Sequence, residues 1–122
     1  MSDVDIHETE ALIASDKVEG TAVYNAEHEK LGSIHNVMID KRTGQVEYAV
    51  LTFGGLFGMG ADFYPLPWDA LTYDIDHGGY LVDIDKDSLK SAPHYSPAET
   101  PDFDRAYGQT IYTHYGIDYP LS

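Results

Sequence analysis

One run of alternating aspartates could bind a cation. The segment 83–87, DIDKD, has the carboxylate spacing that opens a calcium-binding loop, in which alternate carboxylates converge on one hard cation. The pattern then departs from such a loop, because its sixth position is Ser88 instead of glycine and its twelfth is His94 instead of glutamate. We therefore interpret the segment as the solvated end of a strand.

A glycine-rich segment, GGLFGMG at 54–60, invites comparison with loops that hold phosphate through backbone N–H groups. Its glycine spacing matches neither the dinucleotide-binding pattern nor the P-loop, and no Lys-Ser or Lys-Thr pair follows it. We expect a hairpin loop without a nucleotide. The apolar side chains of Leu56, Phe57 and Met59 either form a partner-binding surface or fold back over an open barrel end.

The histidines and the absence of cysteine bear on whether the chain has a metal site or a catalytic site. Six histidines are scattered along the chain, with His28 and His77 in predicted turns and His35 in a predicted strand. No two of them share a predicted face at ligand spacing, so we expect neither a metal nor a cofactor. The absence of cysteine excludes thiolate chemistry, and no nucleophile elbow is present. We expect a protein that is not an enzyme.

Charge narrows the classes of partner. Asp and Glu number 21 against 7 Lys and Arg, which gives a formal net charge of -14. Phosphate backbones require clustered basic residues, and Lys41-Arg42 is the only adjacent basic pair, so we expect no direct nucleic-acid binding. The acidic field repels anionic membranes and favours a basic partner. Residues 1–10 contain no apolar run, so we expect no signal peptide or membrane span and a cytoplasmic location.

The elements that position these residues are mainly strands. Alternating apolar residues and turn signals predict six of them, at 17–24, 31–40, 45–53, 63–68, 71–75 and 80–84. The strand at 45–53 is apolar on both faces, which is typical of a central strand. Pro65 and Pro67 indicate an edge strand or the end of a strand. Trp68, beside Tyr64, is expected in the core, with an aromatic groove for proline-rich peptides as the alternative.

A helix is predicted in the C-terminal tail. Thr100 is expected to cap it, Pro101 to occupy its first position and Gly116 to end it. An apolar stripe then recurs at helical spacing, formed by Phe103, Ala106, Tyr107, Thr110, Ile111 and His114. This stripe covers either the chain's own barrel or a second subunit or other partner. We divide the chain into a disordered acidic N-terminus (1–11), a barrel domain (12–90) and a linker with a helical tail (91–122).

The region from about Leu12 to Asp85 resembles the PRC-barrel family. The similarity rests on KVEGTAVYNAEHEKLGSIHNVMIDKRTGQVEYAVL and on YAVLTFGGLFGMGADFYPLPWDAL, in which the glycine-rich loop precedes Tyr64-Pro65-Leu66-Pro67-Trp68. The match is to stand-alone bacterial members, which are related to the C-terminal domains of the photosynthetic reaction-centre H subunit and of a ribosome maturation factor. The resemblance implies a mainly β fold, a small, partly open barrel of about six strands, here with a C-terminal helical tail.

The resemblance implies docking onto a larger assembly, and it does not imply a reaction. We therefore expect a non-catalytic adaptor that binds a protein partner of unknown identity, with a homodimer favoured because the aromatic tail lets so small a domain gain core by sharing surface. The candidate interaction surface comprises Leu56, Phe57, Met59, Phe103, Tyr107 and Ile111. The alternatives are small-ligand or cation binding at the open end of the barrel, and an accessory role in RNA or ribosome metabolism as in the ribosome maturation relatives.

Overall fold

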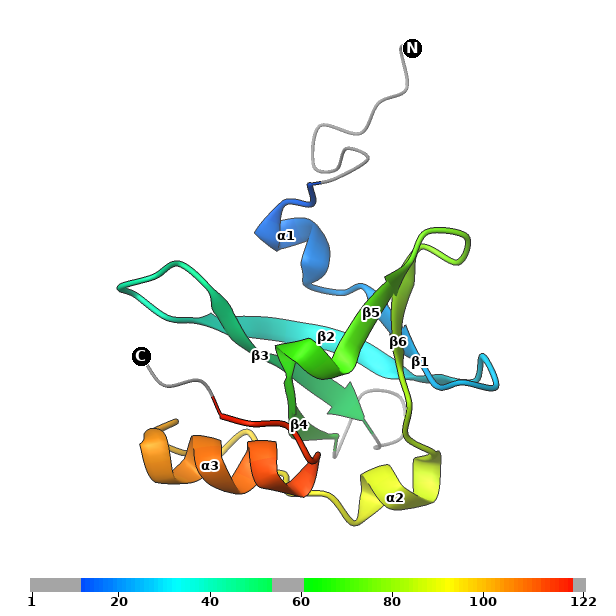
Figure 1. Ribbon diagram of the computed structural model, residues 1–122. Helices are drawn as coiled ribbons and strands as arrows, with labels where there is room; N and C mark the ends of the chain where they lie inside the picture. Colours follow the sequence, from blue (N-terminus) through cyan, green and yellow to red (C-terminus); the bar gives the residue numbers. More distant parts are fainter. Residues whose placement is uncertain (1–11, 54–60, 120–122) are drawn as a thin grey trace.

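The computed structural model describes residues 12–53 and 61–119, which form one curled, six-stranded sheet with short helices at its margins (Figure 1). The strands are β1 (Ala22–Tyr24), β2 (Lys30–Ile39), β3 (Val46–Phe53), β4 (Asp62–Pro67), β5 (Leu71–Asp74) and β6 (Gly79–Val82). Their order is β4-β3-β2-β1-β6-β5. Every neighbouring pair is antiparallel except β1 and β6, which are parallel. The helices are α1 (Ser15–Val18), the 3₁₀ turn η1 (Trp68–Ala70), α2 (Lys86–Lys90) and α3 (Arg105–His114).

The centre and one edge of the sheet follow the predicted pattern. β3 lies between β2 and β4, and four consecutive residues of β3, Tyr48 to Leu51, are buried, as expected for a strand covered on both faces. β4, which carries Pro65 and Pro67, ends the order of strands. Beyond it, Phe63 and Tyr95 exchange backbone hydrogen bonds of 2.9 and 3.0 Å. Both placements confirm the sequence predictions.

The first predicted strand is wrong in its N-terminal half. Ser15–Val18 is the single helical turn α1, and the strand begins only at Ala22. The Thr21 hydroxyl donates a hydrogen bond of 2.6 Å to the carbonyl of Lys17, which holds the turn closed. Gly20 then redirects the chain with a φ of 86°, a conformation that glycine adopts without steric cost. The alternation of apolar residues therefore spans two different local structures.

The tail helix is present, but it begins later than predicted. Asp104, and not Thr100, is the N-cap of α3, since its side chain accepts a hydrogen bond of 2.9 Å from the N–H of Tyr107. Phe103 has a φ of 55°, which no right-handed helix accommodates, so the helix cannot start at Pro101. At the other end, Gly116 has a φ of 70° just after the last turn, and the predicted terminator is confirmed.

Two clusters of buried side chains hold the fold together. The larger lies within the curled sheet and includes Val23, Ile34, Leu51, Leu66 and Leu89. The smaller consists of Tyr48 from β3 with Ile111 and Tyr112 from α3. Trp68 packs against the larger cluster, as expected, with its ring centroid 5.5 Å from that of Tyr80. No helix in the described part of the chain has the length and apolar character needed to cross a membrane.

Candidate functional site

Exposed carboxylates gather where the turn after β1 approaches α2. Two adjoining hollows, of about 270 and 610 Å³, share Asp83, Ile84 and Ser88 in their linings. Glu27 and Asp85 also line the smaller hollow, and Asp87 lines the larger. We call these two hollows the acidic groove. It brings the alternating aspartates of the 83–87 run together with an acid from a distant turn, which sequence spacing alone did not indicate.

The carboxylates of the acidic groove differ in what they bind. Asp85 is the N-cap of α2, and its side chain accepts a hydrogen bond of 2.7 Å from the N–H of Ser88. That N–H group lowers the pKa of Asp85, so this carboxylate stays ionised and serves the helix. Asp83 and Asp87 are exposed, and their carboxylates bond to no other described residue. These two are therefore available to a cation or to the basic side chain of a partner.

The six residues of the predicted interaction surface do not form one exposed patch among the described residues. Leu56, Phe57 and Met59 lie outside the described residues. Ile111 is completely buried against β3, while Phe103 and Tyr107 are half-buried at the margin of the same cluster. The helix therefore packs on the chain's own sheet, which is the first of the two alternatives. The buried face of α3 also differs from the predicted stripe: it is formed by Gly108, Ile111 and Tyr112, whereas Ala106, Thr110 and His114 are exposed.

Tyr112 anchors α3 to the sheet. Its hydroxyl donates a hydrogen bond to the backbone carbonyl of Glu47, at the beginning of β3. Its ring meets that of Tyr48 edge to face, with centroids 5.7 Å apart, an arrangement that aromatic pairs favour. Burial raises the pKa of Tyr112 to about 12. This hydroxyl is a structural donor and is poorly suited to proton transfer near neutrality.

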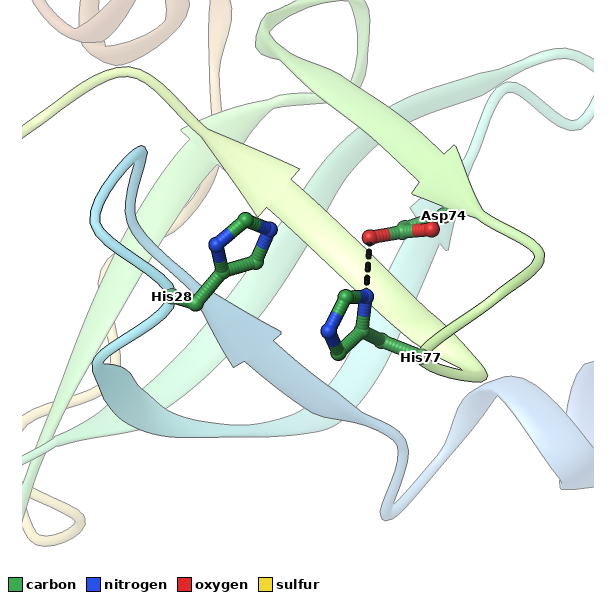
Figure 2. Close-up of side chains that lie close together, drawn as sticks. All are labelled: His28, Asp74 and His77. Atoms are coloured by element: carbon green, nitrogen blue, oxygen red, sulfur yellow. Dashed lines mark hydrogen bonds and ion pairs between the residues drawn. The ribbon is translucent and has the colours of Figure 1, made fainter.

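A second cluster brings together two histidines that appear scattered in the sequence. His28, Asp74 and His77 each offer a ligand atom, and these atoms lie within 4.8 Å of one another. Figure 2 shows the His28 side chain, from the turn between β1 and β2, directed towards His77 in the β5–β6 hairpin. The two imidazole rings stack, with centroids 4.6 Å apart and planes inclined by 23°. The Nδ1 atom of His77 lies 2.6 Å from Oδ2 of Asp74.

Asp74 also holds the hairpin that presents His77. Its Oδ1 atom accepts a hydrogen bond of 3.0 Å from the N–H of Asp76, and its carbonyl accepts one of 2.9 Å from the N–H of Gly78. Partial burial raises the pKa of Asp74, but the hydrogen bond and charge of His77 together with backbone N–H groups outweigh it, and the pKa is lowered. Asp74 is therefore ionised more readily than an ordinary aspartate.

Sequence reasoning missed this cluster because a long-range strand pairing creates it. β1 and β6 are parallel neighbours, with Val23 opposite Tyr80 and Tyr24 opposite Leu81. The turn that follows β1 and the hairpin that precedes β6 are thus separated only by a three-residue strand, about 10 Å of extended chain. Two long side chains can meet across that distance. Periodicity within each strand carries no signal of which strands pair.

Comparisons with known proteins agree with this architecture. The family model of the PRC-barrel domain matches residues 10–89. An uncharacterized protein of Deinococcus radiodurans is 25% identical over 76 residues, which cover 62% of this chain and 27% of that relative. The chain thus spans about a quarter of that relative's length.

A solved structure from Pseudomonas aeruginosa, of a protein assigned to 16S ribosomal RNA processing and called RimM, is also similar. It superposes with a TM-score of 0.41 and 19% identity, over 69% of this chain and 50% of that one. Similarity at this level says nothing of function. The family match covers well over half of the chain and fits the curled six-stranded sheet, and this chain is a member of the PRC-barrel family.

Proposed function

We propose that this protein is a non-catalytic docking module that binds a basic segment of a protein partner at the acidic groove. The proposal rests on Asp83 and Asp87, whose carboxylates are exposed at the adjoining hollows and are not neutralised by any described residue. Exposed acids with no internal role suit electrostatic recognition of Lys or Arg.

The shape of the acidic groove suits a Lys or Arg side chain. The smaller hollow, about 270 Å³, is bounded by Glu27, Asp83 and Asp85, which would face a guanidinium or ammonium group. Ile84 lines both hollows, and the larger hollow adds Tyr115. Lys and Arg combine a charged head with an apolar stem, so the groove offers both kinds of contact.

The charge of the whole chain favours the same class of partner. A formal net charge of -14 attracts a basic surface before contact and accelerates the encounter. Such steering weakens as salt screens the charges. We therefore expect association to be fast at low ionic strength and to slow as salt is added.

Site-specific crosslinking identifies the partner. A photoreactive amino acid in place of Ser91, which lines the larger hollow, should capture a protein with a basic segment in the host cell. The same amino acid in place of the exposed Glu99 is the control. The captured partner is then purified and titrated against the full chain by fluorescence anisotropy.

Charge reversal tests the groove itself. The double variant Asp83→Lys, Asp87→Lys should bind the purified partner about tenfold more weakly, since each exposed pair contributes up to about 1 kcal/mol. The double variant Glu99→Lys, Asp102→Lys makes the same change in net charge at exposed positions and should retain nearly all the affinity. Equal losses in both double variants, or binding that salt leaves unchanged, would contradict docking at the acidic groove.

A further inference from the structure

We propose that His28, Asp74 and His77 form a binding site for a divalent transition-metal ion such as Zn²⁺. Two side chains come from the β5–β6 hairpin and one from the turn after β1, and their ligand atoms already lie within 4.8 Å of one another (Figure 2). None of the three ligands lines the acidic groove, which adjoins the site at Glu27, and metal binding does not depend on the docking function.

The distances are close to those that a metal requires. Ligand atoms bound at about 2.1 Å in a tetrahedral site are roughly 3.4 Å apart. The Nδ1 atom of His77 and the Oδ2 atom of Asp74 are 2.6 Å apart and share a hydrogen bond. A metal ion would replace that proton, and the two atoms would need to move apart by less than about 1 Å. His28 and His77 are exposed, so their rings can turn to meet the ion.

The donor set selects the class of ion. Two imidazoles and one carboxylate suit Zn²⁺ and its neighbours in the first transition row. Ca²⁺ and Mg²⁺ prefer oxygen ligands alone, so they should compete poorly here. Water would complete the coordination, because both histidines are exposed.

The turn that carries His28 is ordered by a buried side chain. Asn25 is only 1% exposed, and its Oδ1 atom accepts hydrogen bonds of 3.0 and 2.9 Å from the N–H groups of Glu27 and Glu29. The carbonyl of Asn25 accepts a hydrogen bond of 2.9 Å from the N–H of His28, whose φ is 63°. A turn whose backbone is already ordered loses little backbone entropy on binding.

Charge around the cluster also favours a cation. Glu27 and Glu29 flank His28, and Asp76 precedes His77. Glu27 and Asp76 are exposed, as is Glu29, whose carboxylate accepts a hydrogen bond of 2.8 Å from the amide of Asn25. Among the described residues, no Lys or Arg side chain forms an ion pair with a carboxylate of the cluster. The local field therefore adds to the attraction for a divalent ion.

Binding would link two parts of the sheet. The ion would bridge the turn after β1 and the β5–β6 hairpin, across the parallel pairing of β1 with β6. A ligand that binds only the folded chain stabilises it by mass action. Zn²⁺ should therefore raise the melting temperature of the full chain.

Isothermal titration calorimetry of the tag-free full chain with Zn²⁺ and with Ni²⁺ tests the site. We expect one ion per chain. His28→Asn, in which asparagine tolerates the left-handed backbone, and His77→Gln should each weaken binding by about tenfold or more. His114→Gln removes another exposed histidine, on α3, and should bind like the wild type. Circular dichroism verifies that each variant is folded.

Imidazole NMR spectra recorded during the same titration locate the ion. The signals of His28 and His77 should shift first, and a large excess of Ca²⁺ should not reverse the shifts. The proposal is overturned if both folded variants bind Zn²⁺ like the wild type, if other histidines respond first, or if Ca²⁺ displaces Zn²⁺. The last result would indicate unspecific attraction to the acidic surface.

Discussion

Gly32 and Gly108 are required by close packing and not by their backbone angles. A β-carbon on Gly32, in β2, would lie 2.0 Å from the backbone carbonyl oxygen of Thr52 on β3. A β-carbon on Gly108, in α3, would lie 2.3 Å from the ring of Tyr119 and 2.6 Å from the hydroxyl of Tyr48. The obstacle is backbone in the first case and the ends of side chains in the second.

This difference predicts unequal costs for the same substitution. Gly32→Ala should lower the free energy of unfolding by about 3 kcal/mol or more, since two paired strands must separate. Gly108→Ala should cost about 1 kcal/mol, because the tyrosine rings can shift and alanine also favours the helix by about 1 kcal/mol. Urea unfolding of both variants measures the two values. Equal costs, or a Gly32→Ala variant as stable as the wild type, would show that the sheet yields at this contact.

The helix α3 carries two tyrosines with opposite roles. The Tyr112 hydroxyl bonds to the carbonyl of Glu47, whereas the buried hydroxyl of Tyr107 has no hydrogen-bond partner among the described residues. Burial is the main cause that raises the pKa of each to about 12 from the usual 10.0. The neutral phenol is therefore favoured in the folded state. Its stabilising effect is complete below pH 10 and is lost as the pH rises towards 12.

Removing each hydroxyl should therefore change stability in opposite directions. Tyr107→Phe should raise the free energy of unfolding by about 1 kcal/mol, because an unpaired buried hydroxyl is costly. Tyr112→Phe should lower it by about 1 to 3 kcal/mol, since the Glu47 carbonyl loses its donor. Urea unfolding below pH 10 measures both, and the fall in stability above pH 10 should be shallower in either variant. A Tyr107→Phe variant less stable than the wild type would mean that this hydroxyl is paired.

The sequence predicts elements well where the signal is local. Five strands, the central position of β3 and the edge position of β4 follow from periodicity and from prolines. Two predicted boundaries are wrong. The left-handed φ of Phe103, which is rare for a residue other than glycine, delays the start of α3. The helical turn α1 interrupts the apolar alternation before Ala22. The His28–His77 contact depends on the parallel pairing of β1 with β6, which joins segments about 50 residues apart. No property of either segment specifies that pairing.

At the scale of the molecule, charge and the tail together bear on self-association. The predicted homodimer drew on the apolar tail, but Ile111 and Tyr112 are buried against the chain's own β3. Two copies would also each carry a formal charge of -14, and like charges oppose association at low salt. The homodimer stays a prediction, and salt should favour it.

The same charge should make the stability of the fold depend on salt. With 21 acidic and 7 basic residues, repulsion within the chain opposes the compact state, and at about 0.15 M salt the screening length falls to about 8 Å. We expect the melting temperature to rise from low salt to about 0.5 M NaCl, and equally in choline chloride, since screening depends on ionic strength. The His28→Asn variant should show the same rise, which separates screening from metal binding. Repeating the series at several protein concentrations tests the dimer, because only an associating chain melts at a concentration-dependent temperature. A melting temperature that stays constant or falls as salt is added would mean that the acids are spaced too widely for repulsion to matter.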